Sequence, residues 1–363
     1  MLQDEPAAAP AHRPGSALRA ARPEPPHPDY THLRQLTNET GLWEHALFLT
    51  PREEHGFCTD DNARGLLVVS RPTSPAAELA DLAEVYLRFV LDARTAAGQF
   101  HNRRRADGGW IDEIGSDDSQ GRAWWGLGSV ARSGPVPWMR EAAFDAFDAC
   151  NSFESAHLRA NAYAALGAAE VLAADPGNAA ATELLERTSG IIVTASDRIP
   201  WPEARLTYDN ARLPEALLAA GVALADRHLI SVGIRLLEWL VRVETNHDHF
   251  SFTPVGGWTP GGPRPGFDQQ PIDAAAMAEA CHRAWTVTNK PVWRERALDA
   301  VRWFVGQNDT GMVLYDSRTG GTCDGLMHHS VNENRGAEST LAGIAALQIA
   351  ERFSTGILGT AAH

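Results

Sequence analysis

Two six-residue segments of this chain are nearly identical. Residues 59–64 read Thr-Asp-Asp-Asn-Ala-Arg and residues 207–212 read Thr-Tyr-Asp-Asn-Ala-Arg, and each runs into an apolar stretch. Looser relatives place an acid or amide just before a stretch rich in Ala, Leu and Gly, and they lie at 116–119, 152–155, 268–271 and 336–339. A feature that recurs at intervals of tens of residues indicates a repeated helical architecture.

The stretches that follow these segments are small-sided and poor in charge. Near-uniform apolarity with much Ala and Gly is typical of helices that are buried on most sides. We therefore expect six buried helices, at 63–70, 121–131, 156–172, 211–225, 272–285 and 337–350.

Segments of a second kind alternate with them. These carry large apolar residues at helical spacing, separated by charges, as expected of helices with one wet face. They lie at 76–92, 138–150, 179–194, 229–243 and 292–305, with a weaker sixth inside 30–48. Strand signals are scarce, and only 250–253 and 312–315 suggest short hairpin pieces.

Six buried helices alternating with about six amphipathic ones predict an all-α (α/α)6 toroid over residues 29–355. Consecutive helices are then antiparallel, so all inner helices open at one mouth, where the acidic segments converge. The long loops at 95–116, 197–207, 245–267 and 308–335 support a working face at that end. Residues 1–28, rich in Ala and Pro, and residues 356–363 are expected to be flexible.

Composition excludes several classes of function. The formal charge of -14 argues against a nucleic-acid partner, because phosphate backbones attract basic surfaces. No apolar run approaches the roughly 20 residues that span a bilayer, and no secretory signal is visible, so we expect a cytoplasmic protein without a membrane partner. No Walker A loop, Rossmann fingerprint or nucleophile elbow is present, and we expect no cofactor. The widely spaced Cys58, Cys150, Cys281 and Cys323 indicate buried, reduced thiols.

The mixture of acids and tryptophans at the predicted mouth suits a carbohydrate, because carboxylates bind hydroxyl groups and indole faces cover sugar rings. Asp61 and Asp209 open the first and fourth inner helices, so we expect them to face each other across a substrate-sized gap. Two carboxyl groups can cleave a glycoside as acid and base. The candidate catalytic residues are Asp61, Asp118, Asp209 and Glu338.

Further residues near these acids are candidates for substrate contact. They are His55, Asp60, Asn62, Arg64, Asp117, Trp125, His157, Trp201, Asn210, Gln269, Gln270 and Asn334. Each has a structural alternative. An Asp before a buried helix is commonly an N-cap, Arg64 and Arg212 can be structural ion-pair partners, and a histidine can be a core residue. A zinc site built from Cys281, His282, Cys323, His328 and His329 is disfavoured by irregular spacing, so we expect no metal.

Several segments together resemble a bacterial family of glycosidase-like (α/α) toroid domains, found alone or fused to glycosyltransferase domains. The segments are 55–64, 115–123, 209–214, 267–271 and 334–341. The resemblance implies a carbohydrate-active toroid that acts on mannose-containing or related oligosaccharides. Gln120 departs from it, because a histidine is expected there in relatives. A nucleotide-sugar-binding α/β domain is not visible in the sequence.

The leading hypothesis from the sequence is a glycoside hydrolase, with inversion weakly favoured because opposed carboxylates leave room for water. A sugar epimerase or isomerase on a similar toroid is the alternative, ranked lower because no histidine recurs at the inner-helix starts. A third hypothesis is a non-catalytic glycan-binding partner of a glycosyltransferase. The sequence leaves open whether the chain forms a homo-oligomer.

Overall fold

The computed structural model describes residues 23–71, 76–148, 153–195 and 201–355. Most of the N-terminal segment predicted to be flexible, the C-terminal residues 356–363 and Cys150 lie outside the described residues. Every statement below concerns the described part of the chain.

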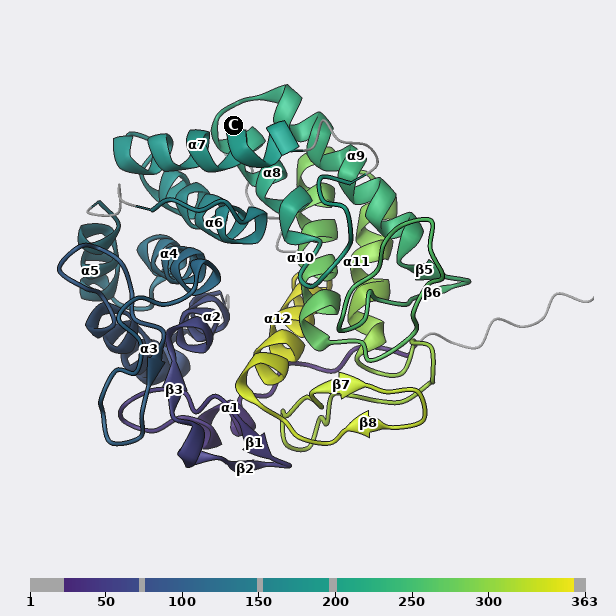
Figure 1. Ribbon diagram of the computed structural model, residues 1–363, viewed down its shortest axis with the longest axis horizontal. Helices are drawn as coiled ribbons and strands as arrows, with labels where there is room; N and C mark the ends of the chain where they lie inside the picture. Colours follow the sequence, from purple (N-terminus) through teal and green to yellow (C-terminus); the bar gives the residue numbers. More distant parts are fainter. Residues whose placement is uncertain (1–22, 72–75, 149–152, 196–200, 356–363) are drawn as a thin grey trace, which may run out of the picture.

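Six helices form a closed inner ring around the molecular centre (Figure 1). Each contacts the next along the chain, and α12 returns to contact α2. This arrangement confirms the predicted (α/α)6 toroid. The inner helices are α2 (Thr59–Ser70), α4 (Asp117–Ser133), α6 (Leu158–Ala174), α8 (Arg212–Ala223), α10 (Pro271–Thr288) and α12 (Ala337–Ser354).

Five longer helices pack outside this ring, each connecting two inner ones. They are α3 (Ala80–Asp92), α5 (Pro137–Asp148), α7 (Ala179–Ala195), α9 (Arg227–Val243) and α11 (Pro291–Trp303). The sixth outer helix predicted within 30–48 is only the five-residue α1 (Thr31–Gln35), which contacts α12. A 3-10 turn, η2 (Ala76–Leu79), leads into α3, and a second, η1 (Glu53–His55), precedes α2.

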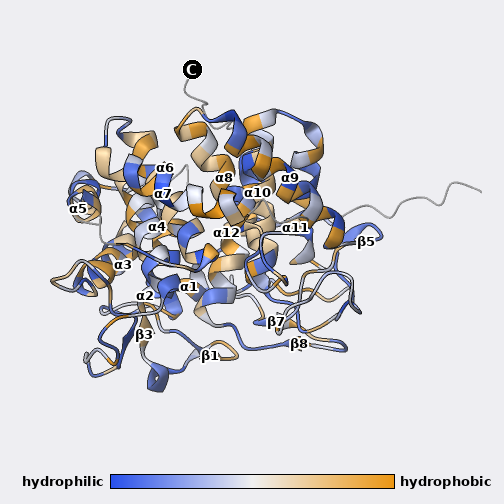
Figure 2. Ribbon diagram, turned by 45° about the horizontal axis from the view of Figure 1, so that its top comes forward, coloured by the Kyte–Doolittle hydropathy of each residue, from blue (hydrophilic) through white to orange (hydrophobic). Residues whose placement is uncertain are grey.

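Small residues allow the inner helices to approach each other closely. A Cβ atom added to Gly121 would come within 3.1 Å of the Ala160 carbonyl carbon, and one added to Gly128 within 2.8 Å of the Gly167 carbonyl carbon. Larger side chains at these positions of α4 would therefore push α6 away. Hydrophobic residues lie along the inner helices, while hydrophilic ones follow the β1 and β3 loops (Figure 2).

Four short antiparallel hairpins lie in the loops. β1 (Ala46–Leu47) pairs with β2 (Thr50–Pro51), β3 (Phe57–Cys58) with β4 (Arg103–Arg104), β5 (Thr245–Asn246) with β6 (His249–Phe250), and β7 (Gly325–Leu326) with β8 (Val331–Asn332). The strand predicted at 250–253 is present only as β6. At 312–315 there are isolated bridges, from Val313 to Val305 and from Tyr315 to Thr322.

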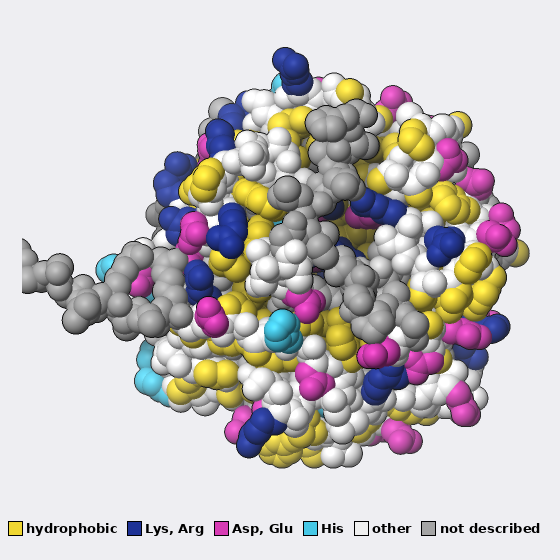
Figure 3. Space-filling view, turned by 180° about the vertical axis from the view of Figure 1, so that it is seen from behind, with side chains coloured by type: hydrophobic (Ala, Val, Ile, Leu, Met, Phe, Trp, Pro, Cys, Tyr) yellow, Lys and Arg dark blue, Asp and Glu magenta, His cyan; other side chains and the backbone are white. Residues whose placement is uncertain are grey.

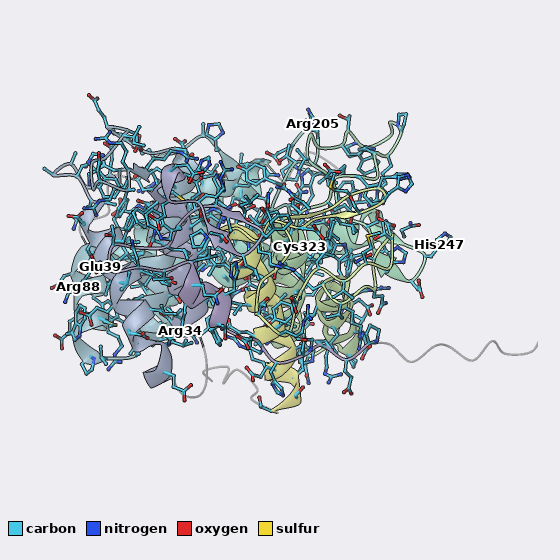
Figure 4. The ribbon with its side chains drawn as sticks, turned by 90° about the horizontal axis from the view of Figure 1, so that it is seen from below. Arg34, Glu39, Arg88, Arg205, His247 and Cys323 are labelled. Atoms are coloured by element: carbon cyan, nitrogen blue, oxygen red, sulfur yellow. The ribbon has the colours of Figure 1, made fainter. Side chains whose placement is uncertain are left out.

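The two ends of the toroid differ. In the side view of Figure 4, Arg205, in the long loop before α8, lies at one edge, and the last turns of α12 point to the opposite edge. Figure 3 shows the molecule from behind, where acidic, basic and hydrophobic side chains are interspersed on the visible described surface. No helix in the described ranges is long and apolar enough to cross a membrane.

Candidate functional site

The starts of two neighbouring inner helices form the wall of one cavity. We call it the α2/α12 cavity, and its volume is about 330 Å³. It contains Asp60, Asp61 and Arg64 of α2 and Glu338 of α12. The remaining lining residues are Glu44, His45, Cys58, Asn102, Arg103, Gln270, Asp324, Asn332, Gly336 and Ser339.

Local hydrogen bonds fix the start of α2. Cys58 is its N-cap residue and accepts the backbone N–H of Asp61 through Sγ. The Asn62 amide donates to the Cys58 carbonyl at 2.8 Å, and its oxygen accepts the Leu42 N–H at 3.1 Å. Asn62 is fully buried, so it anchors the helix start rather than contacting a ligand. Asp60 and Asp61 occupy the first turn, where helix N–H groups stabilise negative charge.

A single guanidinium joins the acids of this cavity. Nη1 of Arg64 lies 3.0 Å from Oδ1 of Asp61 and 2.7 Å from Oε2 of Glu338. Nε of the same side chain lies 3.4 Å from Asp60. Arg64 therefore serves as the structural ion-pair partner that the sequence left open, and it also lines the cavity.

Asp61 is the most perturbed acid of the cavity. Burial raises its pKa to about 7, the nearby Asp60, Glu44 and Glu338 raise it further, and Arg64 opposes the shift. Only 6% of its side chain is exposed, whereas 41% of the Glu338 side chain is exposed. A carboxyl group with a pKa close to ambient pH can both accept and release a proton.

Asp209 does not face Asp61 across a substrate-sized gap, as the sequence predicted. It is fully buried, and Tyr163 donates to its Oδ2 at 2.7 Å. Arg122 reaches from Asp60, at 2.9 Å, to Asp209, at 3.3 Å, so a guanidinium fills the space between the two motifs. The backbone of Asp209 is left-handed (φ 50°), which Asp tolerates better than most residues, and its N–H donates to Asp273 at 2.7 Å.

The ion pairs continue from Asp209 into the interior. Arg212 contacts Asp209 at 3.2 Å, Glu215 at 2.7 Å and Glu279, and Arg71 also contacts Glu279. Although burial raises the pKa of Glu279, the two guanidiniums lower it to about 2. Arg212 is therefore the structural ion-pair partner that the sequence offered as an alternative.

Asp118 lies in a different cavity, of about 1000 Å³, between the start of α6 and the end of α7. We call it the α6/α7 cavity. Its lining includes His157, Arg159, Glu203 and Tyr208, and the Tyr208 hydroxyl donates to Asp118. The single bowl predicted from the sequence is thus divided: Asp61 and Glu338 share one cavity, Asp118 lines another, and Asp209 is buried.

Most of the remaining predicted contact residues have structural partners. Trp125 is 1% exposed beneath Arg212, Trp201 stacks on Trp239, and Asn210 accepts from Arg159 at 2.8 Å. Gln269 is fully buried and accepts the Phe252 N–H and the Trp303 indole N–H.

Four others lie nearer the surface. Asp117 accepts from the Ser155 hydroxyl at 2.6 Å, and Asn334 accepts the Phe48 N–H at 3.0 Å. His55 packs edge-on against His45, with ring centroids 4.9 Å apart. Of these less certain candidates, Asp60, Arg64 and Gln270 line the α2/α12 cavity, and His157 lines the α6/α7 cavity.

Sequence reasoning missed the residues that other segments bring to the α2/α12 cavity. Glu44 and His45 come from the turn before β1, Asn102 and Arg103 from the β4 segment, and Asp324 from the loop before β7. Arg103 lies opposite Cys58 in the β3–β4 hairpin and binds Glu44 at 2.6 Å. The run Arg103–Arg105 in a long loop was the one sequence signal that could have indicated it.

No group of three or more His, Cys, Asp or Glu side chains within the described ranges is placed to hold a metal ion. Cys58, Cys281 and Cys323 are free and buried, as predicted for three of the four thiols.

No protein-family model matches the chain, and no curated protein matches it in sequence. The family resemblance described above therefore stays a prediction. Similarity appears among solved structures.

A sugar epimerase from a ruminal bacterium superposes with a TM-score of 0.68 at 10% identity, covering 89% of this chain and 95% of that one. Cellobiose 2-epimerase from Spirochaeta thermophila gives 0.66 at 13% identity, with 90% and 93% covered. A cellulase of C. cellulolyticum gives 0.55 at 10% identity, with 86% and 88% covered. Identities this low show a shared fold alone.

Proposed function

We propose that this protein is a carbohydrate-active enzyme that epimerises or isomerises a reducing sugar in the α2/α12 cavity, with Asp61 as the proton-transfer group. The observation that carries the proposal is the Asp61 carboxyl itself. It is almost fully buried on the cavity wall, beside a guanidinium, with a pKa raised by burial to about 7.

The chemistry requires only a proton to move. In its open-chain form a reducing sugar has a carbon acid next to the carbonyl group. The Asp61 carboxylate takes that proton and leaves negative charge on the carbonyl oxygen, beside the positive charge of Arg64. Return of the proton to the other face of the same carbon gives an epimer, and return to the neighbouring carbon gives an isomer. Such acid–base catalysis is most efficient when the catalytic pKa lies near the operating pH.

The charges of the cavity favour a neutral sugar. Both guanidiniums that line it are paired, Arg64 with Asp61 and Glu338, and Arg103 with Glu44. An added phosphate or carboxylate would meet acids rather than an available cation. The volume of about 330 Å³ is at the small end of ligand pockets, which suits a sugar of one or two rings.

The structural comparisons support the same reaction class. The sugar epimerases and a D-mannose isomerase superpose with TM-scores of 0.66 to 0.68, above the 0.55 of the cellulase. The fold does not require a second catalytic histidine, because His45, which lines the cavity, and Glu338 are both available as partners for Asp61.

Glycoside hydrolysis is the second candidate, because Asp61 and Glu338 line the same cavity. The two oxygens that contact Nη1 of Arg64 lie within about 6 Å of each other, shorter than the roughly 6.5–9.5 Å of inverting enzymes. This pair therefore does not favour the inversion expected from the sequence. Arg64 also lies between the two carboxyl groups, where the scissile bond would have to enter.

One experiment separates these reactions. The protein is incubated in D₂O with neutral reducing mono- and disaccharides, with their phosphorylated counterparts, and with non-reducing glycosides in the presence and absence of phosphate. Mass spectrometry and NMR detect the products. We expect deuterium at the carbon next to the carbonyl group of a neutral sugar and little reaction of sugar phosphates.

The matched variants are Asp61→Asn and Asp226→Asn. Loss of the catalytic carboxylate is expected to reduce turnover at least 100-fold. Asp226 caps α9, and Asn caps helices equally well, so Asp226→Asn is expected to keep full activity. In the wild-type protein kcat/KM is expected to rise as pH increases through about 7, because the base must be ionised. Release of free sugar from glycosides would establish hydrolysis instead, and binding without turnover would contradict both enzymatic readings.

A further inference from the structure

Cys58 occupies an unusual position for a cysteine. It is the last residue of β3 and the N-cap of α2, it is 3% exposed, and it lines the α2/α12 cavity. The other side-chain-capped helices of the ring and its surroundings use oxygen: Ser116 caps α4 and Asp226 caps α9. Oxygen side chains are the strong N-caps, and sulfur is a weaker acceptor.

The thiol and Asp61 are joined by two reciprocal hydrogen bonds. The Cys58 S–H donates to Oδ2 of Asp61 at 3.1 Å, and the Asp61 N–H donates to Sγ at 3.4 Å. Oδ1 of the same carboxyl group accepts from Arg64 at 3.0 Å. The orientation of the carboxyl group is thus set from one side by a cation and from the other by a thiol.

A donor to a carboxylate stabilises its ionised form, and a stronger donor does so more. A hydroxyl at position 58 would cap α2 better and would also make Asp61 a stronger acid. The thiol provides the orientation with less of that second effect. The other charged groups that face Asp61 are Asp60, Glu44 and Glu338, which disfavour its ionisation, and Arg64 and Arg103, which favour it.

We propose that Cys58 is a positioning residue: its thiol orients the Asp61 carboxyl in the cavity while stabilising the ionised form less than a hydroxyl would. The inference rests on the proposed role of Asp61. It concerns a hydrogen bond, so it can be measured without any assay of activity.

The test compares Cys58→Ser and Cys58→Ala with the matched control Cys281→Ser, whose thiol is buried in α10 and contacts Met277. The protein is labelled with ¹³C at Asp carboxyl groups, and the Asp61 signal is identified by its loss in Asp61→Asn. We expect the titration midpoint of Asp61 to fall by about one pH unit in Cys58→Ser and to rise in Cys58→Ala. Cys281→Ser is expected to leave it unchanged, and the pH dependence of kcat/KM is expected to move with the midpoint.

A measurement on the wild-type protein covers the case in which a variant does not fold. The infrared S–H stretching band of Cys58 should shift as pH passes the Asp61 midpoint, because the acceptor becomes charged, and this shift should be absent in Asp61→Asn. An Asp61 midpoint that is the same in folded Cys58→Ser and Cys58→Ala, or a thiol band indifferent to pH, would overturn the inference. Shifted midpoints in a protein that converts no sugar would instead refute the proposed function alone.

Discussion

The same four residues, Asp-Asn-Ala-Arg, have different surroundings in their two copies. At Asp61 the preceding residue is Asp60, the cap is Cys58, and the carboxyl group lines a cavity. At Asp209 the preceding residue is Tyr208, and Arg122 and Tyr163 from neighbouring helices bind the carboxyl group in the interior. The motif was visible in the sequence, but side chains contributed by other helices decide which copy can meet a ligand.

Buried carboxyl groups also make stability depend on pH, and Glu244 shows this away from the cavity. Burial raises its pKa to about 7, opposed by hydrogen bonds from Thr253. A folded-state pKa above the unfolded value of 4.5 means that the stabilising effect of the proton is complete below about pH 4.5 and is lost as pH rises through 7.

Glu244→Gln is therefore expected to gain stability relative to the wild-type protein as pH rises from 4 to 8, by up to about 3 kcal/mol. The amide oxygen of Gln can still accept from Thr253. Urea denaturation at both pH values measures the difference. Glu84→Gln, on the exposed surface of α3, is the control, with an expected change below about 0.5 kcal/mol. A pH-independent effect of Glu244→Gln would contradict this account.

At the scale of helices, the ring depends on close contact between neighbours. α4 and α6 approach each other through Gly121, Gly128 and Gly167, where an added Cβ would meet backbone atoms. Gly190 lies on the outer helix α7, and nothing lies within 4 Å of the place its Cβ would occupy. These glycines therefore have opposite consequences for stability.

Gly128→Ala is expected to destabilise the protein by about 1–3 kcal/mol, because the backbone of α6 cannot give way as a side chain can. Gly190→Ala is expected to stabilise it by about 0.5–1 kcal/mol through its better helix propensity. Thermal unfolding of both variants checks the pair. Equal effects would mean that α4 and α6 are not in the close contact described here.

Helix periodicity and small-residue content were sufficient to predict the inner and outer helices, because both are properties of single segments. The start of α8 was less well predicted, since the left-handed Asp209 delays it to Arg212. The hairpins β1–β2 and β7–β8 were not predicted, because two-residue strands have no periodicity to detect. They nevertheless lie beside the segments that supply His45 and Asp324 to the cavity.

Across the whole molecule, charged side chains form a continuous path from the cavity into the centre of the ring. It runs from Glu338 through Arg64, Asp60, Arg122 and Asp209 to Arg212 and Glu279. Removing one member would leave its partners buried without a counter-charge, which is strongly destabilising. The path connects five inner helices and makes the interior of the toroid a rigid support for Asp61.

The central claim is that a sugar binds against Asp61 between α2 and α12. A crystal structure of Asp61→Asn, which keeps the shape of the side chain, soaked with the neutral sugar of the panel that binds most tightly, tests it directly. The account predicts that the sugar lies in the α2/α12 cavity, with a ring or chain atom in contact with the side chain at position 61. A sugar in the α6/α7 cavity, against Asp118 and Tyr208, with the α2/α12 cavity free of it, would contradict the account.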